Sequence, residues 1–145
     1  MAQADNARPL SPHLAVWRWG PAMVVSILHR AAGNGLAFGG IAMLLWWLGA
    51  LASGPAAYQT FVHWVWTAEP GNSLQAVTAV LGKLVLLGLS WAFFQHMSSG
   101  IRHFFLDVGA GYELDTNTRW SMVTMASGVV LTALFWVLIC YKHMM

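Results

Sequence analysis

The stretch WSMVTMASGVVLTALFWVLICY, residues 120–141, decides the fold class of this chain. It contains no Asp, Glu, Lys or Arg, while Arg119 precedes it and Lys142 follows it. A helix needs about 20 consecutive apolar residues to cross the hydrocarbon core of a bilayer. Residues 120–141 therefore predict a membrane-spanning helix, and residues 142–145 form a short tail beyond it.

The composition of the whole chain agrees with this prediction. Of its 145 residues, 58% are hydrophobic and only 8% are charged, and the mean hydropathy is +0.59. A soluble domain carries about a quarter of charged residues. The nine Trp and seven Phe suit a protein whose ends lie among lipid headgroups, where aromatic rings are enriched.

Several function classes are excluded by the same numbers. The net charge is only +2 and the basic residues are scattered, so the clustered basic face of a nucleic-acid-binding protein is absent. Cys140 is the single cysteine, which rules out an intramolecular disulfide and indicates a small buried hydrophobic residue. No carboxylate pair and no nucleophile with an adjacent base occurs in the membrane part, so we expect no catalytic residue in this chain.

Two further segments are long and apolar enough to span a bilayer. One covers residues 24–51 and stops near an SGP turn. The other covers residues 73–105, with Ser73 as its candidate N-cap. The outer loop between them, residues 52–72, contains the aromatic stretch YQTFVHWVW. That stretch is too short to span and is predicted to lie along the membrane interface as a loop or short helix.

These patterns predict an all-α integral membrane protein with three transmembrane helices in a bundle, preceded by an interfacial N-terminal arm over residues 1–23. Lys and Arg concentrate on the cytoplasmic side of membrane proteins. Five such residues lie in the arm, at the start of the first helix, or in the loop 106–119 and its flanks, namely Arg8, Arg18, Arg30, Arg102 and Arg119. In the loop and the tail on the opposite side, only Lys142 occurs. We therefore expect the N-terminus and the loop 106–119 in the cytoplasm, with Lys83 snorkelling to the outer surface.

Titratable side chains gather in HMSSGIRHFFLD, residues 96–107, at the end of the second predicted helix. His96, Gly100 and His103 share one helical face, and His96 lies about two turns deeper than His103. Gly100 leaves room for a flat, bulky group to approach the backbone. Asp107, four residues after His103, is either its i, i+4 partner or a solvated charge past the helix end.

Two interpretations of His96 remain open at this point. An imidazole in hydrocarbon needs a partner, which is either a polar group on a neighbouring helix or the iron of a haem. A haem with two histidine ligands would need its second histidine from another helix or another chain. His29 sits beside Arg30 at the mouth of the first helix, and we expect it to be too shallow to lie opposite His96.

The second cluster is SILHR, residues 26–30, at the start of the first predicted helix. Ser26, His29 and Arg30 share a face there. A hydroxyl and a fixed cation beside an apolar helix can seat a quinone headgroup, and the basic groups can also neutralise haem propionates. The alternative is that Arg30 only anchors the helix at the membrane surface and Ser26 bonds its own backbone.

The two clusters together resemble the signatures of the cytochrome b membrane anchor subunit of succinate dehydrogenase. The first signature runs from RPLSPHL, residues 8–14, to SILHR, and the second is the spacing His-x3-Gly-x-Arg-His…Asp within residues 96–107. The resemblance covers nearly the whole chain. It departs from the family at Ala32, where Ser or Thr is usual, and at Leu106, where an aromatic residue or Met is more usual.

The resemblance implies a haem b shared with a second, smaller membrane anchor subunit, each subunit supplying one histidine to the iron. His96 matches the family's haem ligand. Three further residues are candidates for contacts to the haem propionates, namely His29, Arg102 and His103. Two such ligands leave no open iron position, so the haem would carry electrons rather than activate oxygen.

The resemblance also implies a role in ubiquinone reduction. Ser26 and Arg30 match residues of the family's ubiquinone pocket, which the second anchor and an iron-sulfur subunit complete. Succinate oxidation belongs to a separate flavoprotein subunit, so this chain anchors the enzyme and helps pass electrons to quinone. A related fumarate reductase or another quinone-linked dehydrogenase is an alternative, as is a non-redox helical membrane protein. Because no presequence is recognisable, we expect a bacterial inner membrane rather than a mitochondrial one.

Overall fold

The computed structural model describes residue 12 and residues 15–144, without the side chains of residues 143 and 144. In this part of the chain, three helices are long and apolar enough to cross a membrane, Pro21–Ala52, Ser73–Asp107 and Leu114–Lys142. No strand occurs among the described residues. The predicted all-α fold with three long apolar helices is confirmed. Most of the predicted arm, with nearly all of the RPLSPHL motif, lies outside the described residues.

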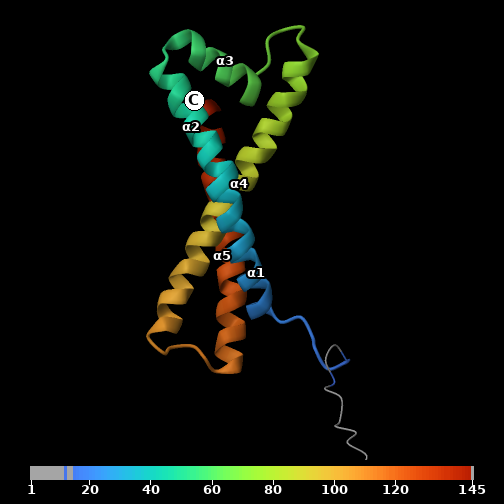
Figure 1. Ribbon diagram of the computed structural model, residues 1–145, viewed down its shortest axis with the longest axis vertical. Coiled ribbons are helices and arrows are strands. Elements are labelled where there is room, and N and C mark those ends of the chain that lie inside the picture. Colours follow the sequence, from blue (N-terminus) through green and yellow to red (C-terminus); the bar gives the residue numbers. More distant parts are fainter. Residues whose placement is uncertain (1–11, 13–14, 145) are drawn as a thin grey trace, which may run out of the picture.

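The first long helix is one continuous rod of three consecutive elements (Figure 1): α1 (Pro21–Gly35), the π-helical turn η2 (Leu36–Gly40) and α2 (Ile41–Ala52). Pro21 takes the first helical position, where its fixed φ suits a helix and its missing N–H leaves no bond unmade. The helix therefore begins before the predicted residue 24. In the π turn, the N–H of Ile41 donates to the carbonyl of Leu36, five residues earlier.

The aromatic stretch of the predicted outer loop forms a short helix, α3 (Pro55–Val65), which joins the end of α2 to the loop before α4 (Figure 1). Gly54 before it has φ of 98°, a conformation that glycine adopts without steric cost. Phe61 and Val65 of this helix are buried together with Ala50 of α2 and form the small hydrophobic core of the molecule.

The second long helix, α4 (Ser73–Asp107), is capped by Asn72 rather than by Ser73, because the Asn72 side chain accepts a hydrogen bond from the N–H of Gln75 at 3.1 Å. The third, α5 (Leu114–Met144), begins well before the predicted residue 120. The connection between them is therefore only residues 108–113, and it turns through Gly109 and Gly111, whose φ angles are 85° and 82°.

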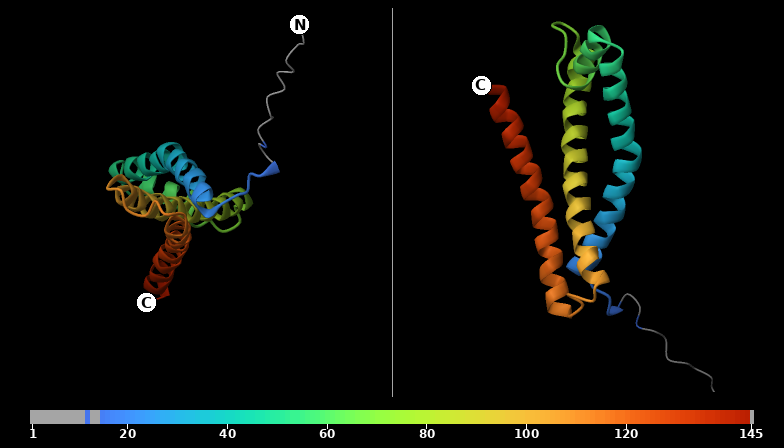
Figure 2. Two further views of the ribbon diagram at one scale, coloured as in Figure 1. Left: turned by 90° about the horizontal axis from the view of Figure 1, so that it is seen from below. Right: turned by 90° about the vertical axis from the view of Figure 1, so that its left-hand side faces the viewer.

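α4 is the central helix, because it packs against α1, α3 and α5. Seen from the side, α5 lies close to α4 near the short connection and leans away from α4 and α2 toward its C-terminal end (Figure 2). Near that end, the indole N–H of Trp136 donates to the hydroxyl of Ser90 across 2.8 Å and ties α5 to α4. The third helix thus leans away from the bundle toward its C-terminal end but stays bonded to α4 through Trp136.

Little of the apolar surface is buried within this chain. In the most hydrophobic window of each long helix, only 6%, 11% and 17% of the residues are buried. Lys83 lies near the α3 end of α4, where its ammonium group is 5.4 Å from the ring centroid of Trp66. The exposed apolar faces fit helices that are surrounded by lipid or by other membrane subunits.

Two glycines allow the closest approaches between helices. A methyl group on Gly82 of α4 would lie 2.9 Å from Cα of Val65 in α3 and would also press on its carbonyl oxygen. A methyl group on Gly128 of α5 would lie 2.5 Å from the amide oxygen of the fully buried Gln95. Small residues at such crossings let two backbones approach each other, as is common in membranes.

We expect the Gly82→Ala substitution to destabilise the protein by about 1–3 kcal/mol, because the added methyl group meets backbone atoms that cannot move aside alone. The measurement is thermal unfolding of the purified complex in detergent, followed by circular dichroism. Gly88→Ala is the matched control, since it lies in the same helix and its methyl group would meet nothing within 4 Å. Equal unfolding temperatures for the two variants would contradict the packing of α3 on α4.

Candidate functional site

The imidazole of His96 projects from α4 toward α1 and lies flat against the ring of His29. The ring centroids are 4.0 Å apart and the ring planes differ by 11°. Gly33 provides the space for this contact, since a methyl group there would lie 2.9 Å from Cε1 of His96. The sequence predicts that His29 is too shallow to lie opposite His96. Because α1 begins at Pro21, His29 is about two turns inside the helix and its ring does reach that of His96, but the two rings are stacked and do not lie opposite each other.

The hydrogen bond of His96 defines which of its nitrogens carries the proton. Its Nδ1 lies 3.1 Å from the main-chain carbonyl oxygen of His29. A carbonyl can only accept, so Nδ1–H is the donor, and in the neutral ring the lone pair is on Nε2. Metal-binding histidines commonly donate their second ring N–H to a carbonyl in this way. The interhelical bond that sequence reasoning offered as an alternative to metal binding is thus present, and it leaves Nε2 unused.

Ser99 holds the ring of His29 in place. Its hydroxyl oxygen lies 2.6 Å from Nδ1 of His29 and also reaches the carbonyl oxygens of Gln95 at 2.8 Å and His96 at 3.0 Å. The side chain is fully buried. The sequence does not single out Ser99, because Ser98 and Ser99 are adjacent in the motif and only the helical phase relative to α1 distinguishes them.

His103 completes a row of three imidazoles. Its ring centroid is 5.1 Å from that of His29, with the planes at 66°, and His103 is exposed. Gly100 lies between His96 and His103 on α4, and a methyl group there would meet nothing within 4 Å. The face of α4 that carries His96 and His103 is therefore open beside Gly100, where the sequence predicts the approach of a flat group. The described residues contain no ion pair between Asp107 and His103.

Ser26 and Arg30 lie on an exposed face of α1, next to the face that carries His29. In the described part of the chain, neither side chain makes a hydrogen bond, including one from Ser26 to its own helix. The structure thus brings these two residues to one surface near the start of α1. It does not bring them into contact with His96.

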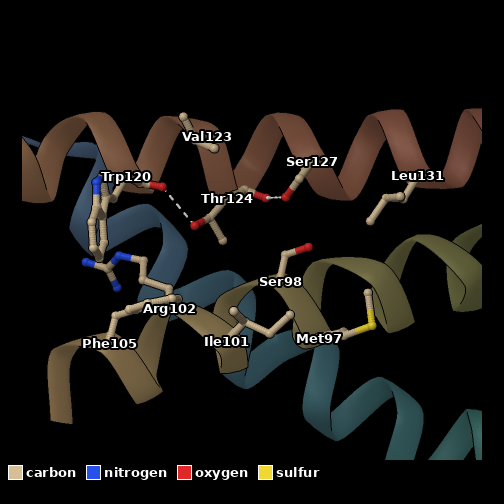
Figure 3. A pocket seen from close by; sticks show the side chains of 10 residues that line it. All are labelled: Met97, Ser98, Ile101, Arg102, Phe105, Trp120, Val123, Thr124, Ser127 and Leu131. Atoms are coloured by element: carbon tan, nitrogen blue, oxygen red, sulfur yellow. Dashed lines mark hydrogen bonds between the residues drawn. The ribbon is translucent and has the colours of Figure 1, made fainter. Parts of the chain in front are cut away.

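Arg102 is separated from the histidines. It is buried on the side of α4 that faces α5, and its guanidinium donates to the amide oxygen of Asn117. The close view shows its side chain extending toward Trp120 of α5 (Figure 3). Of the three residues predicted to contact haem propionates, the structure therefore gathers His29 and His103 beside His96 and places Arg102 elsewhere.

The chemistry available at the histidine cluster is limited by its geometry. Among the described residues, no group of three or more His, Cys, Asp or Glu side chains could hold a metal ion. His29 and His96 are stacked nearly parallel, so they cannot face each other across one iron atom. His96 can therefore offer one nitrogen to a metal, and the stacked ring of His29 cannot be the ligand on the other side.

Three long apolar helices, with an imidazole held between two of them, define a helical membrane protein with a rare polar cluster inside its bundle. The sequence profile of the succinate dehydrogenase/fumarate reductase transmembrane subunit family matches residues 4–135. The chain belongs to this family, and within it to the cytochrome b subunits of succinate dehydrogenase.

Individual relatives agree over most of their length. The chain is 37% identical to the succinate dehydrogenase cytochrome b556 subunit of Paracoccus denitrificans over 127 residues, which cover 88% of each chain. It is 34% identical to the subunit of the same name from Rickettsia conorii, over 91% of this chain and 93% of the relative. It is also 32% identical to the mitochondrial cytochrome b560 subunit of Sus scrofa, over 88% and 71% respectively.

The Ser99→Ala substitution is expected to destabilise the protein by about 0.5–1.5 kcal/mol, since it removes the hydrogen bond between the buried Ser99 hydroxyl and Nδ1 of the part-buried His29. The measurement is chemical unfolding of the purified complex, followed by tryptophan fluorescence. Ser98→Ala is the matched control, because Ser98 is adjacent and makes no hydrogen bond among the described residues. A Ser99→Ala variant as stable as the control would show that this hydroxyl does not support the histidine cluster.

Proposed function

We propose that this chain, as the cytochrome b membrane anchor of a succinate dehydrogenase, binds one face of a haem b through Nε2 of His96 and forms part of a ubiquinone site with Ser26 and Arg30. The observation that supports it best is the bond from Nδ1–H of His96 to the carbonyl oxygen of His29, 3.1 Å away. That bond favours the neutral tautomer whose free lone pair is on the second nitrogen, as an iron ligand requires.

The residues around His96 fit a haem. Gly33 lets the imidazole lie against α1, and Gly100 leaves open space on the face of α4 beside it, where a flat macrocycle can approach. His103 is exposed on that face, and we propose that it and His29 hydrogen-bond the propionates. When bound, a haem with two histidine ligands carries single electrons between partners. His96 orients it, and α1 and α4 exclude water from one side.

We propose that the second iron ligand comes from a second membrane anchor subunit. The ring of His29 is stacked on His96 and is not opposite it, so His29 does not suit that role. An iron-sulfur subunit and a flavoprotein subunit would then lie at the cytoplasmic side, above the start of α1 and the loop after α4. The distribution of Lys and Arg supports this orientation, and we propose the bacterial inner membrane as the location of this multi-pass protein.

The expected effect of His96→Ala is loss of the reduced b-type haem absorption from the purified complex, because one iron ligand is removed. Gly33→Ala keeps the ligand and displaces its ring, and we expect it to weaken haem retention about tenfold, as changes behind a metal ligand commonly do. Both are measured by visible spectroscopy and haem extraction per complex.

Gly35→Ala is the control for Gly33→Ala, since Gly35 lies on the same helix and its methyl group would meet nothing within 4 Å. An unchanged haem spectrum in His96→Ala would disprove the ligand assignment. An unchanged spectrum in Gly33→Ala alone would show that the position of the ring is not set by its contact with α1.

The exposed face of Ser26 and Arg30 suits a quinone headgroup, because it offers a hydroxyl and a fixed cation at the end of an apolar helix while the isoprenoid tail stays in lipid. Their side chains are accessible and, within the described chain, not committed to other hydrogen bonds. An anchor residue would also be exposed, so the assignment needs a kinetic test.

We expect Arg30→Ala to lower succinate:ubiquinone reductase activity roughly tenfold or more, since a charged hydrogen bond contributes about 1.5–3 kcal/mol. Ser26→Ala should lower the same activity by a smaller factor, since a neutral hydrogen bond contributes about 1 kcal/mol. Succinate oxidation with an artificial electron acceptor should remain. Ser53→Ala, on an exposed residue at the far end of the same long helix, should affect neither activity. Equal loss of both activities in Arg30→Ala would count against a quinone site.

A further inference from the structure

Arg102 is a buried cation without a counter-ion. Only 8% of its surface is exposed, and the group that it contacts, the amide oxygen of Asn117, is neutral. Its Nε–H is buried and has no hydrogen-bond partner in the described part of the chain. Among the described residues, no carboxylate pairs with it, since the ion pair there joins His63 and Glu69. A buried charge is energetically costly unless it is paired, so an anion bound beside Arg102 would stabilise it.

A groove between α4 and α5 begins at Arg102. Its volume is about 450 Å³, which is within the range of small-molecule pockets. Besides Arg102 it is lined mainly by apolar and aromatic side chains, among them Ile101, Phe105 and Trp120. In Figure 3, Arg102 and Trp120 lie at one end of the groove, and Met97 and Leu131 lie at the other.

The depth of the groove suits a lipid. Arg102 is five residues before the end of α4 at Asp107, which places it about 7.5 Å along the helix axis from that end. Trp120, in the second turn of α5, is at the same level, where aromatic rings favour the headgroup region. From there the groove follows both helices toward the middle of the membrane, with Ser98 and Ser127 as polar side chains along its walls.

We propose that this groove binds an anionic phospholipid, with the headgroup phosphate on the guanidinium of Arg102 and one acyl chain along the apolar wall. A phosphate supplies both the negative charge and the acceptor oxygens that the free N–H groups of Arg102 need. A quinone headgroup is neutral and does not supply the charge. The site is distinct from the histidine cluster, because His96 faces α1 whereas Arg102 faces α5.

The test uses the whole purified complex, stripped of lipid and then titrated with phosphatidylglycerol or phosphatidylcholine, with bound lipid counted by native mass spectrometry. We expect the wild type to bind phosphatidylglycerol at least about tenfold more tightly than phosphatidylcholine. Arg102→Gln should abolish this preference. Arg119→Gln is the matched control, because Arg119 is an exposed cation at the same end of α5 that does not line the groove; it should keep the preference.

A second variant, Val123→Trp, fills the groove and leaves Arg102 intact; it should also lose the bound lipid. Equal binding of both lipids by the wild type, as when a neighbouring helix covers the groove, would overturn the proposal. So would a Val123→Trp variant that binds like the wild type. If Arg102→Gln instead shifts the midpoint potential of the haem and retains the lipid preference, the anion is a haem propionate and the proposal is wrong.

Discussion

The arrangement of the site depends on one hydrogen bond between two helices, from Nδ1–H of His96 to the main-chain carbonyl of His29. It fixes the tautomer of His96, and it fixes the rotation of α4 relative to α1. It also determines which face of each helix remains available to other molecules. The acceptor belongs to the main chain of α1, so the bond positions the His96 ring relative to the helix backbone. Gly33 and Ser99 support it from either side.

The bundle of this chain is incomplete without its surroundings. The buried polar side chains among the described residues lie on α4 and α5, two helices that pack against each other. They are Gln75, Gln95, Ser99 and Arg102 on α4, and Ser121, Thr124 and Thr132 on α5. Hydroxyls on α5 bond carbonyls of their own helix, as Thr124 does to Trp120 at 2.8 Å, and so add no new demand for partners. Most apolar side chains point outward instead. This separation of buried polar from exposed apolar side chains indicates that helix contacts within the chain rely on small and polar residues. The large apolar residues are left to face lipid and other subunits.

The sequence was sufficient to predict the three long helices, because uncharged runs of this length have few other stable structures. It was also sufficient to single out His96, Ser26 and Arg30 as candidates, since polar groups are rare here. It could not predict that His29 and His96 are stacked, because depth in the membrane depends on where α1 begins and how the helices cross. The placement of Arg102 away from His103 follows from helical phase, although the two residues are adjacent in the sequence. The early start of α5 was hidden by polar residues such as Asp115 and Asn117, which read as a loop.

The π turn at Leu36–Gly40 has a consequence for the first long helix. A π turn accommodates one residue more than an α turn, and each residue of an α-helix advances the helix by about 100°. The side chains of α2 are therefore rotated about the helix axis relative to those of α1. As a result, Gly33 of α1 faces His96 while Ala50 of α2 faces α3. Removing a single residue within this turn would restore a regular helix and twist one half against the other. The inserted turn thus sets the rotation between the half of the helix that contacts the histidines and the half that contacts α3.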